Sequence, residues 1–336
     1  GVRADDDPEA VHDMRVASRR LRAALDAAAP FYRKKDFRRA LRRVKDLAGA
    51  LGFVRDADVL LDFLRERRAA VRREERVGID GLIDALSASR ADARDDLDPV
   101  LDLWEEDEAY AADFRRFTAR VTPRKGKVRP RDLVGAVAAR TILARLEEFE
   151  ERATLFDDPE GGDAIAFHDL RIAAKKLRYM IELFAPVLGD EAEALLAELR
   201  TLQDTLGTLH DRDVLADLLA RERASALERQ LHMLEYTTFN PGTREERLTA
   251  VRDYLQAPDS FARTAIGVYG LLIDAYDDRN QLEDELRARW ATLERGGFRE
   301  RVRALAAGAL PGPAEPTPPE GAEPPDEAGA DEDDEG

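Results

Sequence analysis

The sequence predicts an all-α protein made of two related helical bundles and a disordered acidic tail. Apolar residues recur at helical spacing through most of the 336 residues, and no segment alternates apolar and polar residues as a half-buried strand would. An internal repeat, described below, indicates that the helices form two similar sets. Residues 311–336 are rich in Pro, Gly and acid and contain no aromatic residue, a composition that does not bury a core.

The first half of the chain is expected to be a series of helices separated by short turns. Asp7 is a candidate N-cap with Pro8 in the first helical turn, and Pro30 is placed to end that helix. Gly52 is placed to end the next helix, and Asp56 to cap the one after it. The expected helices cover residues 8–29, 36–51, 56 into the 70s, 79–97 and 100–121.

A basic segment rich in Pro and Gly, Thr122–Arg131, is the expected boundary between the two halves of one domain. The domain covers residues 1–310, with its first half at 1–121 and its second at 132–310. In the second half, Pro186 and Gly207 are placed to end helices, and Asp211 to cap the next one. The expected helices cover 133–154, 164–185, 191–206, 211–236 and further segments to about 310, with loops at 157–163 and 237–243 and breaks near 258 and 277–280.

Two segments of the first half return in the second. Val11–Arg22 (VHDMRVASRRLR) returns as Phe167–Arg178 (FHDLRIAAKKLR), 156 positions later, and Leu51–Leu60 (LGFVRDADVL) returns as Leu206–Leu215 (LGTLHDRDVL) at an offset of 155. This agreement indicates that both halves share one helix–turn–helix plan, so two bundles about a pseudo-twofold axis are expected. Only eleven residues precede His12, whereas a full helix precedes His168, so a further N-terminal helix is expected before this sequence begins.

Each copy of the repeated helix carries a stripe of cations. Basic or histidine side chains stand at relative positions 0, 3, 7 and 10, which share one face of an α-helix, while apolar residues occupy another face. The only acids in these stripes are Asp13 and Asp169, so local ion pairs are not expected. The repetition favours an anion-binding site over an ordinary solvated face, and both histidines lie near a helix N-terminus, which attracts phosphate. The candidate contacts are His12, Arg15, Arg19, Arg20, Arg22, His168, Arg171, Lys175, Lys176 and Arg178.

The second helix of each half extends this basic surface, mainly in the first half. There, three bases share one face at i, i+4 and i+7, whereas the aligned face of the second half keeps one. At the following turn an arginine of the first half aligns with a histidine of the second. The anion site is therefore expected to be more basic on its first-half side. The candidate contacts added are Arg38, Arg42, Lys45, Arg55, Arg200 and His210.

The charge distribution supports an anion ligand although the net charge is −17. Residues 311–336 hold ten acids and no base, whereas His12–Arg55 contains thirteen Lys and Arg against four Asp. Such clustering of base in an acidic chain concentrates positive potential in one place. The 46 arginines against 7 lysines are typical both of proteins from a high-salt cytoplasm and of genomes rich in GC.

The composition also limits the compartment and the cofactors. There is no cysteine, so disulfides and thiolate metal sites are excluded. No run approaches the roughly 20 apolar residues of a membrane span, and no signal peptide heads the sequence. We expect a soluble cytoplasmic protein that has no membrane partner, no metal and no cofactor.

The repeated segments VHDMRVASRRLR with LGFVRDADVL, and FHDLRIAAKKLR with LGTLHDRDVL, resemble the signature of the CHAD family, the conserved-histidine α-helical domains. The resemblance covers most of residues 1–310, although the helical residues after about 225 are not accounted for by it. It implies two four-helix bundles around a central basic pore that binds inorganic polyphosphate without catalysis, with localisation at polyphosphate granules. It further implies a partner among the CYTH-type triphosphate enzymes, whose E-x-E-x-K motif is absent from this chain.

Three other functions stay open at this point. His-Asp pairs on helices are also similar to those of metal-dependent HD phosphohydrolases, but here each pair lies in a basic stripe that repels a divalent cation. A basic groove also attracts nucleic acid, although the two signature helices offer only Tyr179 for stacking on bases. The third alternative is a scaffold that docks an acidic partner.

Overall fold

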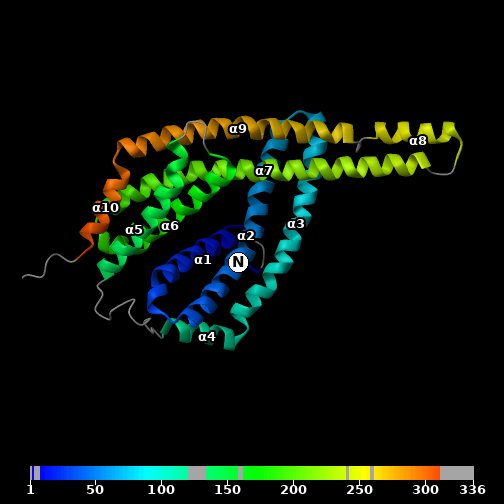
Figure 1. Cartoon of the computed structure of the whole chain (residues 1–336). Helices are drawn as coiled ribbons and strands as arrows, with labels where there is room; N and C mark the ends of the chain where they lie inside the picture. Colours follow the sequence, from blue (N-terminus) through cyan, green and yellow to red (C-terminus); the bar gives the residue numbers. More distant parts are fainter. Residues whose placement is uncertain are drawn as a thin grey trace, which may run out of the picture.

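The computed structural model describes residues 2–3, 8–119, 134–157, 162–239, 242–257 and 261–310. Within these ranges the chain forms α-helices and short 3₁₀ turns and no strand, which confirms the all-α prediction (Figure 1). The helices are α1 (Pro8–Ala28), α2 (Lys34–Ala70), α3 (Arg73–Glu105), α4 (Glu108–Ala119), α5 (Val134–Ala153), α6 (Ala164–Leu188), α7 (Glu191–Phe239), α8 (Arg244–Gln256), α9 (Phe261–Arg295) and α10 (Phe298–Gly308), and the 3₁₀ turns are Ala29–Phe31 and Thr154–Asp157.

Two helices that were predicted to end at glycines run through them instead. α2 continues past Gly52 and α7 past Gly207. A glycine inside a helix costs about 1 kcal/mol relative to alanine, and burial of the apolar residues on both sides of each glycine offsets that cost. Those buried flanking residues are Leu51, Val54, Leu206 and Leu209, none more than 1% exposed.

The continuity of α2 and α7 overturns a second prediction. Asp56 and Asp211 lie inside these helices, so their assignment as N-caps is wrong. The turn predicted near residue 78 lies instead between Ala70 and Arg73.

Other predicted boundaries also differ. α6 continues through Pro186 to Leu188, because a proline so near the C-terminus removes only one of the last hydrogen bonds. α9 is unbroken across 277–280, and α7 extends into the predicted loop at 237–243 as far as Phe239. The linker 122–131, most of the loop at 157–163, the break near 258 and the tail 311–336 lie outside the described residues.

The ends of the second repeated helix follow local capping rules. Asp163 precedes α6, and its side chain accepts a hydrogen bond of 2.8 Å from the backbone N–H of Ala166, as an N-cap does. Gly189 follows α6 with φ of 80°, a left-handed conformation that favours glycine. In the first copy, α1 ends at Ala28, and Pro30 lies in the 3₁₀ turn that follows, as predicted.

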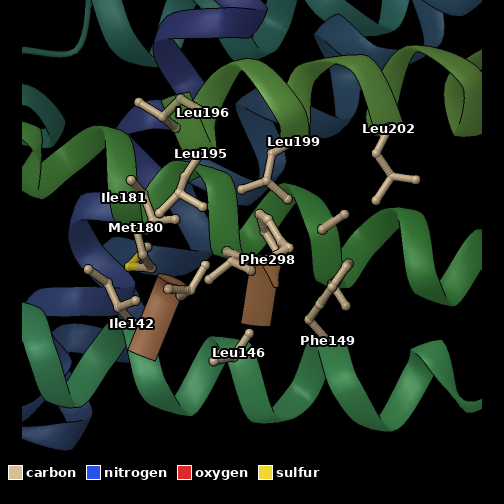
Figure 2. Packing of buried hydrophobic residues seen from close by; sticks show 14 of the residues in the cluster. Ile142, Leu146, Phe149, Met180, Ile181, Leu195, Leu196, Leu199, Leu202 and Phe298 are labelled. Carbon is tan, nitrogen blue, oxygen red and sulfur yellow. The ribbon is translucent and has the colours of Figure 1, made fainter. Parts of the chain in front are cut away.

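The largest core lies among α5, α6, the first part of α7, the end of α9, and α10 (Figure 2). Phe149 is fully buried there, with its ring centroid 5.7 Å from that of Trp290 and 6.0 Å from that of Phe298. Ala23 and Ala27 of α1 belong to the same cluster, so the first repeated helix packs on the second-half bundle.

Two smaller clusters lie within the first half, among α1, α2, α3 and α4. A further cluster joins the halves, since Leu61 of α2 and Ile79 of α3 pack with Leu219 of α7 and Leu271 of α9. α9 and α10 are therefore part of the two packed halves, because α9 packs against α3 and both helices complete the second-half core. The pseudo-twofold relation of the two bundles stays a prediction.

The second part of α7, α8 and the first part of α9 form an arm that projects from the two bundles (Figure 1). Along it, α7 and α9 lie side by side. No helix in the described ranges combines the length and the apolarity needed to cross a membrane.

We expect replacement of Gly267 by alanine to lower the free energy of unfolding by about 1–3 kcal/mol. Gly267 of α9 lies so close to α3 that a Cβ atom would stand 2.0 Å from the carbonyl oxygen of Glu75, so the two helices would have to separate. Urea unfolding followed by circular dichroism measures the effect. Gly81→Ala on α3 is the control, because nothing lies within 4 Å of its Cβ position and alanine should raise stability by up to about 1 kcal/mol. Equal stability of the two variants would contradict the close approach.

Candidate functional site

The two repeated helices, α1 and α6, contact each other (Figure 1). Residues of both basic stripes line one pocket as a result. A pocket of about 480 Å³ lies among α1, α2, α6 and α7. We call it the histidine pocket. Its wall contains the first residues of both stripes and the aligned residues of both predicted turns: His12, Arg15, Arg19, Arg55, His168, Arg171 and His210, together with Val16, Asp56, Val59, Leu60, Asp211 and Val214.

Two histidines of the second half meet in this pocket. The Nδ1 atoms of His168 and His210 lie 3.4 Å apart, so one ring donates a hydrogen bond and the other accepts it. Burial, together with the positive charges of Arg171, His168 and Lys175, lowers the pKa of His210 to about 4. His210 is therefore neutral at pH 7 and serves as a hydrogen-bonding group, not as a cation.

Arg171 lies in the same wall with an incompletely satisfied guanidinium group. Its Nε atom is buried and has no hydrogen-bond partner among the described residues. Burial lowers the pKa of Arg171 below its ordinary value, because the charged form is taken out of water. A buried donor without an acceptor is costly, and an anion in the pocket would supply the acceptor.

Two aspartates contribute negative charge to the histidine pocket. Arg15 donates a hydrogen bond of 2.6 Å to Asp56 Oδ1, which holds that arginine against α2. Burial raises the pKa of Asp211, and the charge of Asp56 adds to this, although Arg171 acts in the opposite direction. The sequence interpretation assigned both aspartates as helix caps. Their aligned positions, next to Arg55 and His210, were the signal that could have placed them in the site.

A second, smaller pocket of about 180 Å³ adjoins the first, because Arg19 lines both. We call it the lysine pocket. It lies among α1, α5 and α6 and is lined by Arg19, Arg22, Ala23, Asp26, Arg145, Ile172, Lys175, Lys176, Tyr179 and Met180.

The two lysines of this pocket are in different electrostatic states. Lys176 forms an ion pair with Glu148 of α5. Lys175 has no hydrogen bond or ion pair with any described residue. Burial, together with the nearby charges of Arg171 and Arg19, lowers the pKa of Lys175 to about 7. Lys175 is therefore only partly protonated at neutral pH.

Arg145 is a pocket residue that the sequence interpretation missed. It lies on α5, pairs with Glu148 at 2.8 Å, and lines the lysine pocket opposite the repeated helices. α5 precedes the second repeat and has no counterpart in the first half of the sequence, so no repeated motif marked this residue.

The remaining candidate contacts lie outside both pockets. Arg20 and Arg200 line a separate pocket of about 430 Å³ with Glu182 and Glu193. Arg38 and Arg42 lie on an exposed basic surface of α2 with Lys34, Lys35 and Arg39. Arg178 pairs with Glu182, and Lys45 is exposed near Asp26. These side chains are not brought together with the histidine pocket.

The expectation that the stripes lack local ion-pair partners is wrong for Arg178, and two further stripe residues pair with carboxylates of other helices. Arg15 pairs with Asp56 from another helix and Lys176 with Glu148, while Arg178 pairs with Glu182 on its own helix at 2.9 Å. Among the described residues, no ion pair or hydrogen bond engages Arg19, Arg20 or Arg22 of the first stripe. The unpaired cations thus lie mostly on the first-half side.

In the ranges that the structure describes, no group of three or more His, Asp or Glu side chains is arranged to hold a metal ion. No curated protein matched the chain in a sequence comparison. A comparison with protein-family models matched residues 1–220 to the CHAD domain, which is well over half of the chain. The match includes both repeats, and therefore all of the helical segments that form the histidine pocket. The chain thus belongs to the CHAD family.

Proposed function

We propose that this protein binds inorganic polyphosphate at the histidine and lysine pockets and does not act on it catalytically. One observation carries the proposal: α1 and α6 place basic side chains of both repeats around one pocket, where Arg171 keeps a buried donor without an acceptor. Family membership agrees with a polyphosphate-related role.

The chemistry of the two pockets suits a chain of phosphates better than a single small anion. Each internal phosphate carries about one negative charge, and a guanidinium group can grip its oxygens with two parallel hydrogen bonds. Because Arg19 lines both pockets, a linear polyanion can pass from the histidine pocket to the lysine pocket beside it. Along this path it would meet Arg15 and Arg171 in the histidine pocket. It would then meet Lys175 and Arg22 in the lysine pocket.

The neutral groups and the carboxylates of the histidine pocket also fit such a ligand. Neutral His210 can donate one hydrogen bond to a phosphate oxygen without adding charge. Asp56 fixes the position of Arg15, so this guanidinium group is held in place before the ligand arrives. Preorganised donors lower the entropy cost of binding.

A titration with polyphosphate tests the proposal. The full chain is titrated with polyphosphate of defined length by isothermal titration calorimetry at fixed ionic strength, and then challenged with single-stranded RNA and duplex DNA at matched phosphate concentration. We expect polyphosphate to bind and to displace both nucleic acids, because the pockets offer few aromatic faces for bases. Displacement of polyphosphate by RNA or DNA would favour a nucleic-acid binder, and no binding of polyphosphate would refute the proposal.

The same preparation tests the enzymatic alternative. Metal analysis of the purified protein and a phosphate-release assay with polyphosphate are expected to show neither a bound metal nor turnover. A tightly bound metal ion together with phosphate release would overturn the non-catalytic role in favour of an HD-type phosphohydrolase. We further propose that the protein acts in the cytoplasm at polyphosphate granules and with a CYTH-type triphosphate enzyme, which co-purification before and after polyphosphatase treatment would test.

We expect polyphosphate binding at pH 8.5 to take up about one proton per site. With a pKa of about 7, Lys175 is mainly neutral at this pH in the free protein, and an adjacent phosphate favours the charged amine, so its pKa rises toward the ordinary value of 10.5. Calorimetry in two buffers of different ionisation enthalpy measures the uptake. Lys175→Arg, which keeps its charge throughout, should bind without proton uptake. Identical heats for the wild type in both buffers would contradict the prediction.

A further inference from the structure

Lys175 has the surroundings of a reactive amine. It lines the lysine pocket and makes no hydrogen bond or ion pair with a described residue, whereas its neighbour Lys176 is paired with Glu148. The charged groups nearest to it are mostly cations: Arg171 on its own helix, and Arg15 and Arg19 on α1.

The nearby carboxylates do not neutralise these cations. Asp211 of α7 favours the charged form of Lys175, but its effect is smaller than that of burial and of each of these three arginines. Asp26, in the wall of the same pocket, has a pKa raised by burial. Burial and the surrounding arginines lower the pKa of Lys175 to about 7, so a large part of the amine carries a free lone pair at physiological pH.

The same pocket can hold a phosphoryl group next to this amine. Arg19 and Arg22 of α1 and Arg145 of α5 line it together with Lys175, and two of them, Arg19 and Arg22, have no ion-pair partner among the described residues. A small molecule that carries a phosphate and a reactive carbonyl would place the first against the guanidinium groups and the second near Nζ. Fixing the two reactants in this way raises the rate of their reaction.

We propose that Lys175 is an acylation site for small acyl phosphates such as acetyl phosphate, a reactivity beyond the proposed binding function. The lone pair of Nζ attacks the carbonyl carbon and forms the C–N bond. The bond between that carbon and the phosphate oxygen then breaks, and phosphate leaves with the electron pair. The proton lost by nitrogen goes to the departing phosphate, so the products are an amide and hydrogen phosphate. The arginines stabilise the negative charge that develops on the leaving group.

Acylation would change what the site can bind. The amide cannot be protonated, so the positive charge that Lys175 would gain beside a polyanion is lost. The acyl group also occupies part of a pocket of only about 180 Å³. Acyl phosphates would therefore weaken polyanion binding by modifying Lys175 covalently.

The test measures acetylation of the wild-type chain by acetyl phosphate without any polyphosphate. Peptide mass spectrometry follows the initial rate at Lys175 and, as internal controls, at the exposed Lys34 and Lys35 and at the paired Lys176. At pH 7.5 we expect Lys175 to react at least about tenfold faster than the controls, because its pKa of about 7 leaves most of this amine with a free lone pair. Its rate should level off above about pH 8, because nearly all of the Lys175 amine is then neutral.

Two further measurements separate specific reaction from general reactivity. Excess inorganic phosphate should slow the reaction at Lys175 and leave Lys34 and Lys35 unaffected, since it occupies the guanidinium groups of the pocket. Lys35→Arg, at an exposed position of α2 outside both pockets, should leave acetylation of Lys175 within about twofold of wild type. The proposal is overturned if Lys175 reacts no faster than the exposed lysines, or if phosphate gives it no protection. Because polyphosphate is absent, this result is independent of whether the chain binds polyphosphate.

Discussion

Replacement of Arg15, Arg19 and Arg22 by alanine is expected to lower the affinity for polyphosphate at least about 100-fold, because hydrogen bonds to charged groups contribute about 1.5–3 kcal/mol each. These residues lie in succession along the stripe of α1, and together they line both pockets. Isothermal titration calorimetry of variant and wild type at the same salt concentration measures the change.

A control variant with the same loss of charge shows whether position matters. Arg65, Arg289 and Arg295 line neither pocket, so their triple replacement by alanine should change the affinity by less than about twofold. The dependence on salt gives a second readout. By analogy with single-stranded nucleic acids, removal of three phosphate contacts should reduce the slope of log K against log salt by about two. Equal effects of the two triple variants would refute the stripe as a specific site.

Replacement of Phe149 by alanine is expected to lower the free energy of unfolding by about 3–5 kcal/mol. Phe149 is fully buried and packs against the rings of Trp290 and Phe298, so the variant would leave a cavity among three elements of the second-half core. Since the free energy of unfolding of a folded protein is typically about 5–15 kcal/mol, this loss is a large part of the total. Urea unfolding monitored by tryptophan fluorescence and circular dichroism measures it.

Phe53→Ala is the matched control, because Phe53 is 70% exposed on α2. Its replacement should change stability by no more than about 0.5 kcal/mol. A loss for Phe149→Ala as small as that of the control would show that α9 and α10 do not close this core. The residues that follow the family match would then have no structural role in the second-half bundle.

The local prediction of helices succeeded where the chain carries strong signals at the helix ends. Pro30 constrains the backbone directly after α1, and Asp163 hydrogen-bonds to the first turn of α6. Both effects are local, so tertiary packing has little influence on these helix ends. The breaks at Gly52 and Gly207 were wrong for the opposite reason. A glycine is only mildly unfavourable in a helix, and the buried residues around it determined the outcome.

The candidate site shows the same difference between features set by local sequence and features set by tertiary packing. His12, Arg15, Arg19 and their counterparts on α6 were recognisable, because a fixed spacing on a helix places side chains on one face wherever the helix packs. The carboxylates within the site were misassigned, since a residue inside a long helix and a residue at a helix start can share the same local sequence. Arg145 gave no signal, because a contact from an unrepeated helix depends on how the helices pack.

The amino-acid sequence by itself determined that the protein is helical, that two stripes of cations repeat in it, and which side chains those stripes contain. These properties follow from periodicity, which is local. Only the tertiary structure decided which cations share a pocket, which are paired with carboxylates, and that Lys175 has a pKa near 7 while Lys176 next to it is held by Glu148. Burial and the distance between charges set those outcomes, and both depend on residues far away in the chain.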